Sequence, residues 1–109
     1  MKMKARIHYW KDIEKWYMDI MYHKKLPSLD DIKRDYVELP ITIDIKDETE
    51  LGKIFYTLNC DNNPMGAPEY QQWIRDNNVH HTSMSVGDVA QLGDRYYICK
   101  DIGWEEIKI

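Results

Sequence analysis

Apolar and polar residues follow two different periods in the first quarter of the chain. Residues 4–10 alternate, with Ala5, Ile7 and Tyr9 pointing one way, and this period of two predicts a strand. From residue 11 the apolar positions recur three and four residues apart, which predicts a helix over 11–22. The apolar stripe of this helix, expected to face the core, comprises Ile13, Trp16, Tyr17, Ile20 and Met21.

A short helix and a long strand are predicted next. Ser28 and Asp31 have the spacing of a capping box, so a helix is expected over 29–34. Residues 36–45 alternate strictly between apolar and polar side chains, as in a strand with one buried and one solvated face. Pro40 has no N–H to donate to a sheet, which predicts that this strand lies at an edge or carries a bulge there.

Two further helices and a loop are expected in the middle of the chain. Asp47 and Glu50 resemble a capping box for a helix over 50–59. Residues 59–67 are rich in Asn and Asp, which favours a loop, and a proline follows that suits the first turn of a helix over 68–77. The apolar stripe of the first of these helices comprises Leu51, Ile54, Phe55 and Leu58.

The C-terminal third predicts a meander of three strands. Residues 85–92 and 95–100 flank Gly93 and Asp94, a pair typical of a tight hairpin turn, and a third strand is expected over 104–109. Together these elements predict an α+β fold, in which helices over 11–22, 50–59 and 68–77 pack on an antiparallel sheet. Whether the strands form one sheet or two is left open by the pattern.

Length and composition suit one globular domain. The chain has 109 residues, of which 43% are hydrophobic and 31% are charged. We therefore expect a single domain over 1–109, with a subdivision into 1–58 and 68–109 as the alternative. No apolar run is long enough for a membrane span, and the charged start predicts no signal peptide. These features predict a cytoplasmic protein whose two cysteines, Cys60 and Cys99, stay reduced.

The net charge argues against nucleic acid as a partner. It is −4 at pH 7, whereas general nucleic-acid binders need an excess of Lys and Arg to displace counterions. The acidic residues concentrate in the second quarter of the chain, so an acidic mimic of DNA is one alternative function. That alternative requires the acids of residues 30–50 to lie on one face, spaced like phosphates.

No standard catalytic or metal-binding motif occurs in the sequence. The histidines and cysteines lack the spacing of zinc ligands, and the glycines form neither a dinucleotide-binding signature nor a P-loop. Ser, His and Asp lie close together near residue 83, but without the G-x-S-x-G elbow of a hydrolase. We therefore expect no catalytic residue, no metal and no cofactor.

The densest polar stretch, residues 78–88, has two alternative interpretations. It carries two imidazoles and three hydroxyls near a glycine, and a small ligand or a nucleotide could bind in a concave pocket that one imidazole faces. Alternatively, it connects a helix to a strand, and its hydroxyls bind their own backbone. The candidate binding residues in this stretch are His80, His81, Ser83, Ser85 and Asp88.

The same stretch carries a resemblance to proteins of mobile elements. Residues 81–89 (HTSMSVGDV), 96–99 (YYIC) and 103–105 (GWE) resemble the C-terminal block of small bacteriophage proteins and of the YodL-like domain of conjugative elements. The resemblance covers residues 58–107 and implies a phage or mobile-element origin, so that the protein would act inside a bacterial cell. It implies no mechanism.

The leading hypothesis is a non-enzymatic protein that binds and modulates a bacterial host or defence protein. Small acidic phage proteins without catalytic motifs often act in this way, which is an analogy. The 8 Tyr and 4 Trp, against 1 Phe, support it because aromatic side chains with a polar tip suit contact surfaces. Tyr96 and Trp104 are therefore candidate binding residues as well. The hypothesis predicts an exposed aromatic patch or an interface with a second copy of the chain.

Overall fold

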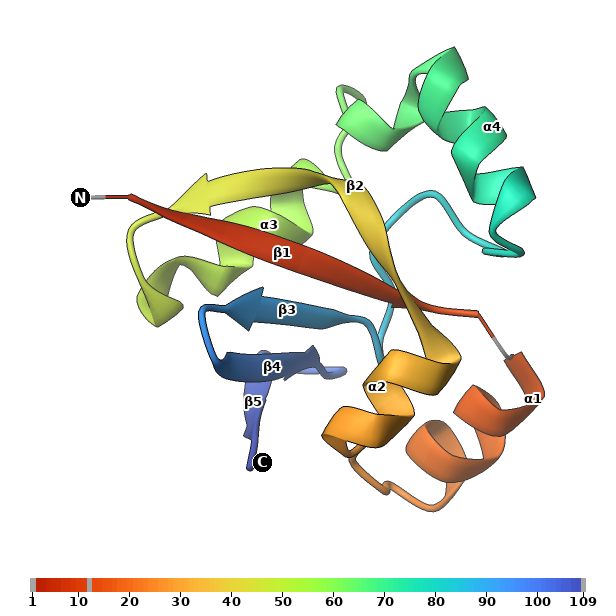
Figure 1. Ribbon diagram of the computed structural model, residues 1–109. Coiled ribbons are helices and arrows are strands. Elements are labelled where there is room, and N and C mark those ends of the chain that lie inside the picture. The colour runs from red at the N-terminus through yellow and green to blue at the C-terminus, as the bar shows by residue number, and fades with distance from the viewer. Residues whose placement is uncertain (1, 12, 109) are drawn as a thin grey trace.

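The chain forms one five-stranded antiparallel sheet with helices on both of its faces (Figure 1). The structure, a computed structural model, describes residues 2–11 and 13–108. Strand order in the sheet is β2-β1-β3-β4-β5, so the predicted α+β class and C-terminal meander are confirmed, and the strands form one sheet. The elements in chain order are β1 (Met3–Trp10), α1 (Ile13–Lys15), the π-helix η1 (Trp16–Tyr22), α2 (Leu29–Asp35), β2 (Tyr36–Ile45), the 3-10 helix η2 (Glu48–Glu50), α3 (Leu51–Thr57), the 3-10 helix η3 (Pro64–Gly66), α4 (Pro68–Asp76), β3 (Val89–Leu92), β4 (Arg95–Cys99) and β5 (Trp104–Ile107).

Strand β2 lies at one edge of the sheet and carries a bulge, as its proline predicts. Arg6 pairs with Thr42 and His8 pairs with Glu38, so residues 39–41 of β2 lie opposite a single residue of β1. Pro40 sits in the middle of this bulge, where no N–H is needed for pairing. The bulge shifts the pairing register between β1 and β2 by two residues. Because this number is even, the apolar side chains of β2 stay on the same face along the whole strand.

The C-terminal strands are shorter than the sequence predicts. Strand β3 begins at Val89, because Ser85 and Asp88 form a turn in which the Asp88 N–H donates to the Ser85 carbonyl at 3.0 Å. The prediction of strand over residues 85–88 is therefore wrong. The tight turn between β3 and β4 is confirmed, with Gly93 at φ +64°. Strand β5 ends at Ile107, and residue 109 lies outside the described residues.

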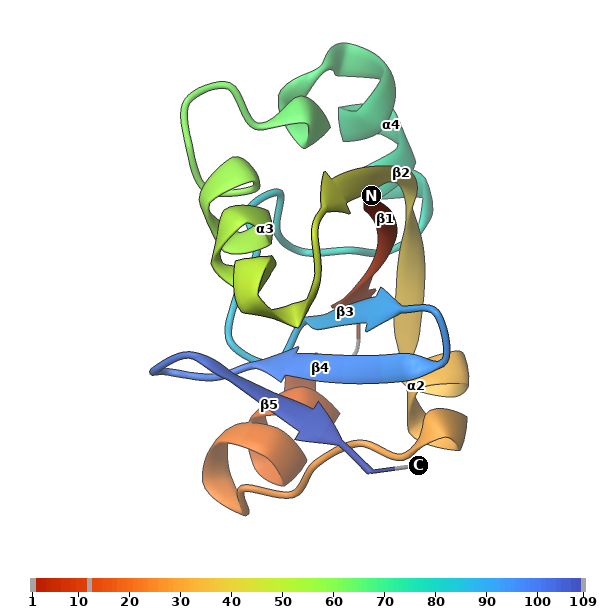
Figure 2. The same cartoon turned by 90° about the vertical axis from the view of Figure 1, so that its left-hand side faces the viewer.

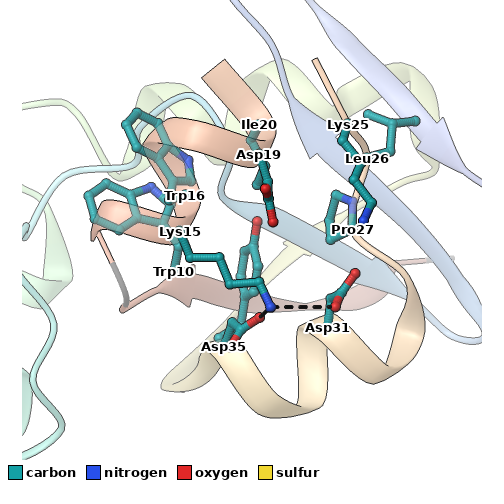
Figure 3. A pocket seen from close by; sticks show the side chains of 11 residues that line it. Trp10, Lys15, Trp16, Asp19, Ile20, Lys25, Leu26, Pro27, Asp31 and Asp35 are labelled. Carbon is teal, nitrogen blue, oxygen red and sulfur yellow. Dashed lines mark ion pairs between the residues drawn. The ribbon is translucent and has the colours of Figure 1, made fainter. Parts of the chain in front are cut away.

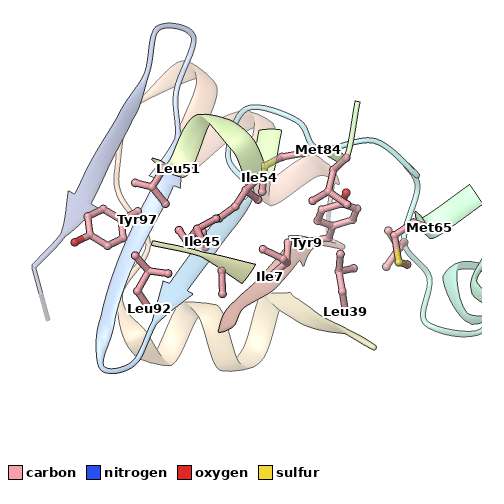
Figure 4. Packing of buried hydrophobic residues seen from close by; sticks show 14 of the residues in the cluster. Ile7, Tyr9, Leu39, Ile45, Leu51, Ile54, Met65, Met84, Leu92 and Tyr97 are labelled. Atoms are coloured by element: carbon pink, nitrogen blue, oxygen red, sulfur yellow. The ribbon is translucent and has the colours of Figure 1, made fainter. Parts of the chain in front are cut away.

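The main core lies between one face of the sheet and helices α3 and α4 (Figure 4). Ile7 and Tyr9 of β1 are fully buried there, and Ile54 of α3 is buried in the same cluster. Burial of such side chains stabilises the fold by about 1.5–3 kcal/mol for each Ile or Leu. Phe55 was expected on the buried stripe of α3 but is 42% exposed, because this short helix buries only a narrow face.

A second, smaller core lies on the opposite face of the sheet. In Figure 2, α3 and α4 lie above β3 and β4, and η1 lies below them. Helix α2 begins at the predicted capping box: Ser28 Oγ accepts from the Asp31 N–H at 3.2 Å, and Asp31 Oδ2 accepts from the Ser28 N–H at 3.0 Å. The buried residues of this second core are Trp10, Ile32, Tyr36, Val89, Ile98 and Ile107, with Trp16, Ile20 and Leu26 packed against them.

The predicted helix over 11–22 winds as a π-helix from Trp16 onward. The His23 N–H donates to the Met18 carbonyl, five residues earlier, at 3.0 Å. Of the predicted apolar stripe, Trp16 and Ile20 pack on the second core as expected, whereas Tyr17 is 56% exposed. The predicted burial of Tyr17 is therefore wrong, and the side chain of Ile13 lies outside the described part of the chain.

Candidate functional site

The predicted polar stretch forms a bend that is anchored by a buried carboxylate. Asp88 is fully buried, and its Oδ2 lies 2.9 Å from Nε2 of His81. Oδ1 of Asp88 accepts from the Trp10 N–H at 3.1 Å, and Oδ2 accepts from the Ser85 N–H at 2.8 Å. Burial raises the pKa of Asp88 to about 6, although His81 and the two backbone N–H groups act in the opposite direction. The carboxylate thus connects the bend to the end of β1.

The His81 ring is held in a series of stacked aromatic rings. It stacks on Tyr9 with centroids 4.5 Å apart and on Trp10 at 4.4 Å, and Trp10 in turn stacks on Trp16 at 4.5 Å. Gly87 lies against Trp16 so closely that a Cβ there would be 1.8 Å from the indole Nε1. The bend, β1 and η1 are therefore locked together by side chains that are distant in the sequence.

The structure separates the predicted site residues into groups. His81, Ser85 and Asp88 come together at the buried carboxylate, while His80 and Ser83 are exposed. Two other candidates lie elsewhere in the fold. Tyr96 lies 6.1 Å, centroid to centroid, from His8 on the sheet, and Trp104 packs against the main core. The seven residues therefore do not form one surface.

A small cavity lies beneath the stacked indoles (Figure 3). Trp10 and Trp16 form one wall, and Lys15 reaches across to Asp35, with 2.9 Å from Nζ to Oδ2, and toward Asp31. Burial works to raise the pKa of Asp35, but hydrogen bonds from Arg34 and Lys15 outweigh it and hold the pKa below its usual value. The cavity volume is about 30 Å³, close to the space of one water molecule. Small-molecule sites typically have volumes of roughly 300–1,000 Å³.

Nothing in the described residues points to catalysis. No three His, Cys, Asp or Glu side chains within residues 2–11 and 13–108 are grouped so that they could hold a metal ion. Burial raises the pKa of the Cys99 thiol to about 11, so the thiolate that a nucleophile needs is scarce at neutral pH. Within the same part of the chain, no helix has the length and apolar character needed to cross a membrane.

The outer side of η1 exposes large apolar side chains. Tyr17, Met18 and Tyr22, together called the η1 face below, are 56%, 48% and 68% exposed. Next to them, Met21 and Ile102 line one hollow between η1 and the turn that joins β4 to β5. The sequence pattern missed the η1 face because helical spacing assigned Tyr17 to the core. The π winding that turns Tyr17 outward has no signal in the pattern.

Comparison with known proteins relates the chain to a viral protein. The chain is 36% identical over 86 residues to the Uncharacterized protein R785 of Acanthamoeba polyphaga mimivirus, and the alignment covers 79% of this chain and 68% of that protein. No family model matches the chain, and no solved structure matches it. The resemblance to the YodL-like domain stays a prediction. By the extent of the alignment, this chain belongs to the same family as the mimivirus protein R785.

Proposed function

We propose that this protein is a non-enzymatic viral binding protein that attaches to a host or host-defence protein through the η1 face. The observation that carries the proposal is the exposure of Tyr17, Met18 and Tyr22 on one short segment. Tyr and Met are enriched in protein interfaces, and contiguous exposed apolar patches mark interaction sites more often than chance. We further propose that it acts in the cytoplasm of the infected cell.

The backbone of this segment supports the same proposal. The π-helix is rare and is found frequently at functional sites. Lys24, which follows η1, adopts φ +57°, a conformation that costs free energy for a residue with a side chain. Both features lie beside the exposed side chains. Meanwhile Trp16 and Ile20, on the inner side of η1, hold the segment to the second core.

A hollow beside the η1 face offers a place for an anchoring side chain. It has a volume of about 250 Å³ and is lined by Ile20, Met21 and Leu26 on one side and Lys100 and Ile102 on the other. Ile102 is 94% exposed at the tip of its turn. Interfaces are dominated by a few side chains that insert into such hollows. A partner that covers the η1 face and inserts a side chain into this hollow would also contact Ile102.

The edges of the sheet are less suited to bind a partner strand. At β2, Pro40 and its bulge interrupt the edge, and β5 at the other edge carries Glu105 and Glu106 and is followed by Lys108. Charged side chains, proline and bulges are the usual protection against strand addition. This supports binding through side chains of the η1 face rather than through backbone pairing.

The alternatives from the sequence receive less support. The imidazole of His81 lies between two rings and bonds to Asp88, so it does not offer a ligand site in residues 78–88. The hypothesis of a DNA mimic is weakened because several acidic residues in the second quarter of the chain are paired with cations, among them Glu38 with Arg6 and Asp44 with Lys4. Paired carboxylates resemble a phosphate backbone poorly.

Quantitative affinity capture tests the proposal. The tagged protein and its Tyr17→Ala/Tyr22→Ala variant are incubated with an extract of cells in which the protein occurs, and bound proteins are identified by mass spectrometry. The matched control is Tyr56→Ala, which removes a 73% exposed tyrosine from α3. We expect a specific partner that the control retains and the double variant loses. A partner retained equally by all three proteins, or none at all, would contradict the proposal.

A further inference from the structure

We infer that the open part of the sheet face beside α2 is a binding site for a small planar organic anion. By the strand register, Arg6 lies beside Gln91 and Gln91 beside Tyr96, while His8 lies beside Glu38. These side chains and those of α2 surround a hollow of about 280 Å³. This volume is close to the lower limit of roughly 300 Å³ for small-molecule sites. The site shares no residue with the η1 face and does not depend on the proposed function.

The floor of the hollow is a buried polar pair. His8 and Gln91 are 8% and 7% exposed, and Nε2 of His8 lies 2.9 Å from Oε1 of Gln91. The Gln91 amide donates through Nε2 to the Gly93 carbonyl at 2.8 Å, so its oxygen faces the imidazole. His8 therefore carries its proton on Nε2, and its Nδ1 is left as an acceptor.

This imidazole is neutral at physiological pH. Burial lowers the pKa of His8, and the hydrogen bond to Gln91 offsets only part of that effect. A buried polar pair on a sheet face costs free energy that an apolar pair would not. The pair thus places hydrogen-bonding groups under the hollow where packing alone would favour Val or Leu.

The rim of the hollow carries an excess of positive charge. Arg6 donates to Glu38 from Nε at 2.8 Å and from Nη2 at 2.5 Å, which uses two of the five N–H donors of a guanidinium. Lys33 of α2 also lines the hollow and adds a second cation. Two cations against one carboxylate give the rim a charge of +1, in a chain whose net charge is −4. The rim therefore favours an anionic group.

The walls of the hollow favour a planar apolar body. The half-buried ring of Tyr96 stands on the sheet side, tilted 42° to the His8 ring, and Leu29 and Ile32 line the side formed by α2. A ligand whose aromatic ring packs on Tyr96 and whose carboxylate or phosphate group binds Lys33 and Arg6 would contact both the walls and the rim. The ligand class is accordingly an aromatic carboxylate or phosphate ester.

NMR titration of the labelled protein separates the contributions of ring and charge. The probes are phenyl phosphate and benzoate, with benzyl alcohol as the ring without charge and inorganic phosphate as the charge without ring. We expect saturable shifts of the His8, Gln91 and Tyr96 signals with a Kd on the order of 1 mM or tighter for a ring-bearing anion, and much weaker effects from the other two probes. The signals of the exposed His23 and His80 should not move.

Variants keep the test independent of folding. Lys33→Ala and Tyr96→Ala alter the rim and wall and should weaken binding by at least about fivefold. Lys53→Ala, on the opposite face of the sheet, is the matched control and should leave the Kd unchanged. The inference is overturned if no probe shifts the His8 signal, if all histidines shift together, or if Lys33→Ala and Tyr96→Ala bind as the wild type does.

Discussion

The carboxylate of Asp88 is the acceptor that holds the bend of residues 81–88 to the sheet. Its two oxygens accept from two different backbone donors, the N–H groups of Trp10 and Ser85. Nε2 of His81 lies within hydrogen-bond distance of both carboxylate oxygens. An ionised carboxylate accepts at both oxygens, which no other side chain of this size does. At the residue scale, this position therefore has a stricter chemical requirement than its neighbours.

Replacing Asp88 by Asn tests this requirement. The amide has one oxygen and one NH₂ group, so it can satisfy only one of the two backbone donors and leaves the other buried without an acceptor. We expect Asp88→Asn to lower the free energy of unfolding by about 1–3 kcal/mol at pH 7, measured by urea denaturation. Asp101→Asn, at an exposed turn, is the control and should change stability little. Equal stabilities of the two variants would refute the account.

The same carboxyl gives stability a pH dependence with an unusual sign. The pKa of Asp88 is raised from 3.8 to about 6 in the folded protein. Between these values the folded state binds a proton that the unfolded chain does not, so this group favours folding more at low pH. The stability difference between wild type and Asp88→Asn should shrink as pH rises from about 4 to about 6, by on the order of 1–3 kcal/mol. A difference that grows with pH would show that the carboxyl is not desolvated.

Gly87 provides a test of the stacked rings. A Cβ at this position would lie 1.8 Å from Nε1 of Trp16, and the residue has φ +97°. We expect Gly87→Ala to lower stability by about 2–5 kcal/mol in thermal denaturation, from steric overlap and backbone strain together. The matched variant is Gly93→Ala, since Gly93 has φ +64° with no described atom within 4 Å of its Cβ position. It should cost only about 1–2 kcal/mol, and equal losses would exclude a role for the Trp16 contact.

At the scale of elements, local signals predicted much of the fold. Pro40 predicted an edge position or a bulge for β2, which has both, and the Ser28–Asp31 pair predicted the start of α2, because these signals act within a few residues. The π winding of η1 could not be predicted in this way. Tyr17 lies outward against the prediction, whereas Trp16 lies inward as predicted and is fixed by Trp10 and Gly87, which lie elsewhere in the sequence.

The candidate site was predictable to the same limited extent. His81 and Asp88 were both in the polar stretch that the sequence singled out, and the structure pairs them. Their burial depends on Tyr9 and Trp10, which come from the first strand of the chain. The spacing within residues 78–88 carries no information on those partners, so the sequence could not separate a ligand site from a structural bend.

Helix α3 allows a test of element stability. Gly52 is exposed near its start, and no atom of the described residues lies within 4 Å of the position its Cβ would take. Alanine there should raise the free energy of unfolding by about 0.5–1 kcal/mol, because glycine loses more backbone freedom in a helix. Urea denaturation of Gly52→Ala measures this gain. A loss of stability would mean that the start of α3 needs the conformational freedom of glycine.

At the scale of the whole molecule, the two faces of the sheet differ in how they are covered. Helices α3 and α4 cover the main core, whereas α2 and η1 cover only part of the opposite face and leave the hollow above His8 open. The η1 face is thus carried by a segment that is anchored through Trp16 and Ile20 and exposed on its other side. An exposed aromatic surface on a segment that is anchored at its inner side suits binding with little loss of conformational freedom.

Site-specific photo-crosslinking in cells tests whether the protein binds a partner through the η1 face. A photoreactive phenylalanine analogue replaces Tyr22 on the η1 face in one protein and the equally accessible Tyr56 on α3 in another, at 68% and 73% exposure. After irradiation, we expect a discrete crosslinked adduct to one cellular protein from position 22 and none from position 56. The adduct should disappear when Tyr17→Ala and Ile102→Ala are added. The same adducts from both positions, or an adduct from position 56 alone, would contradict binding through the η1 face.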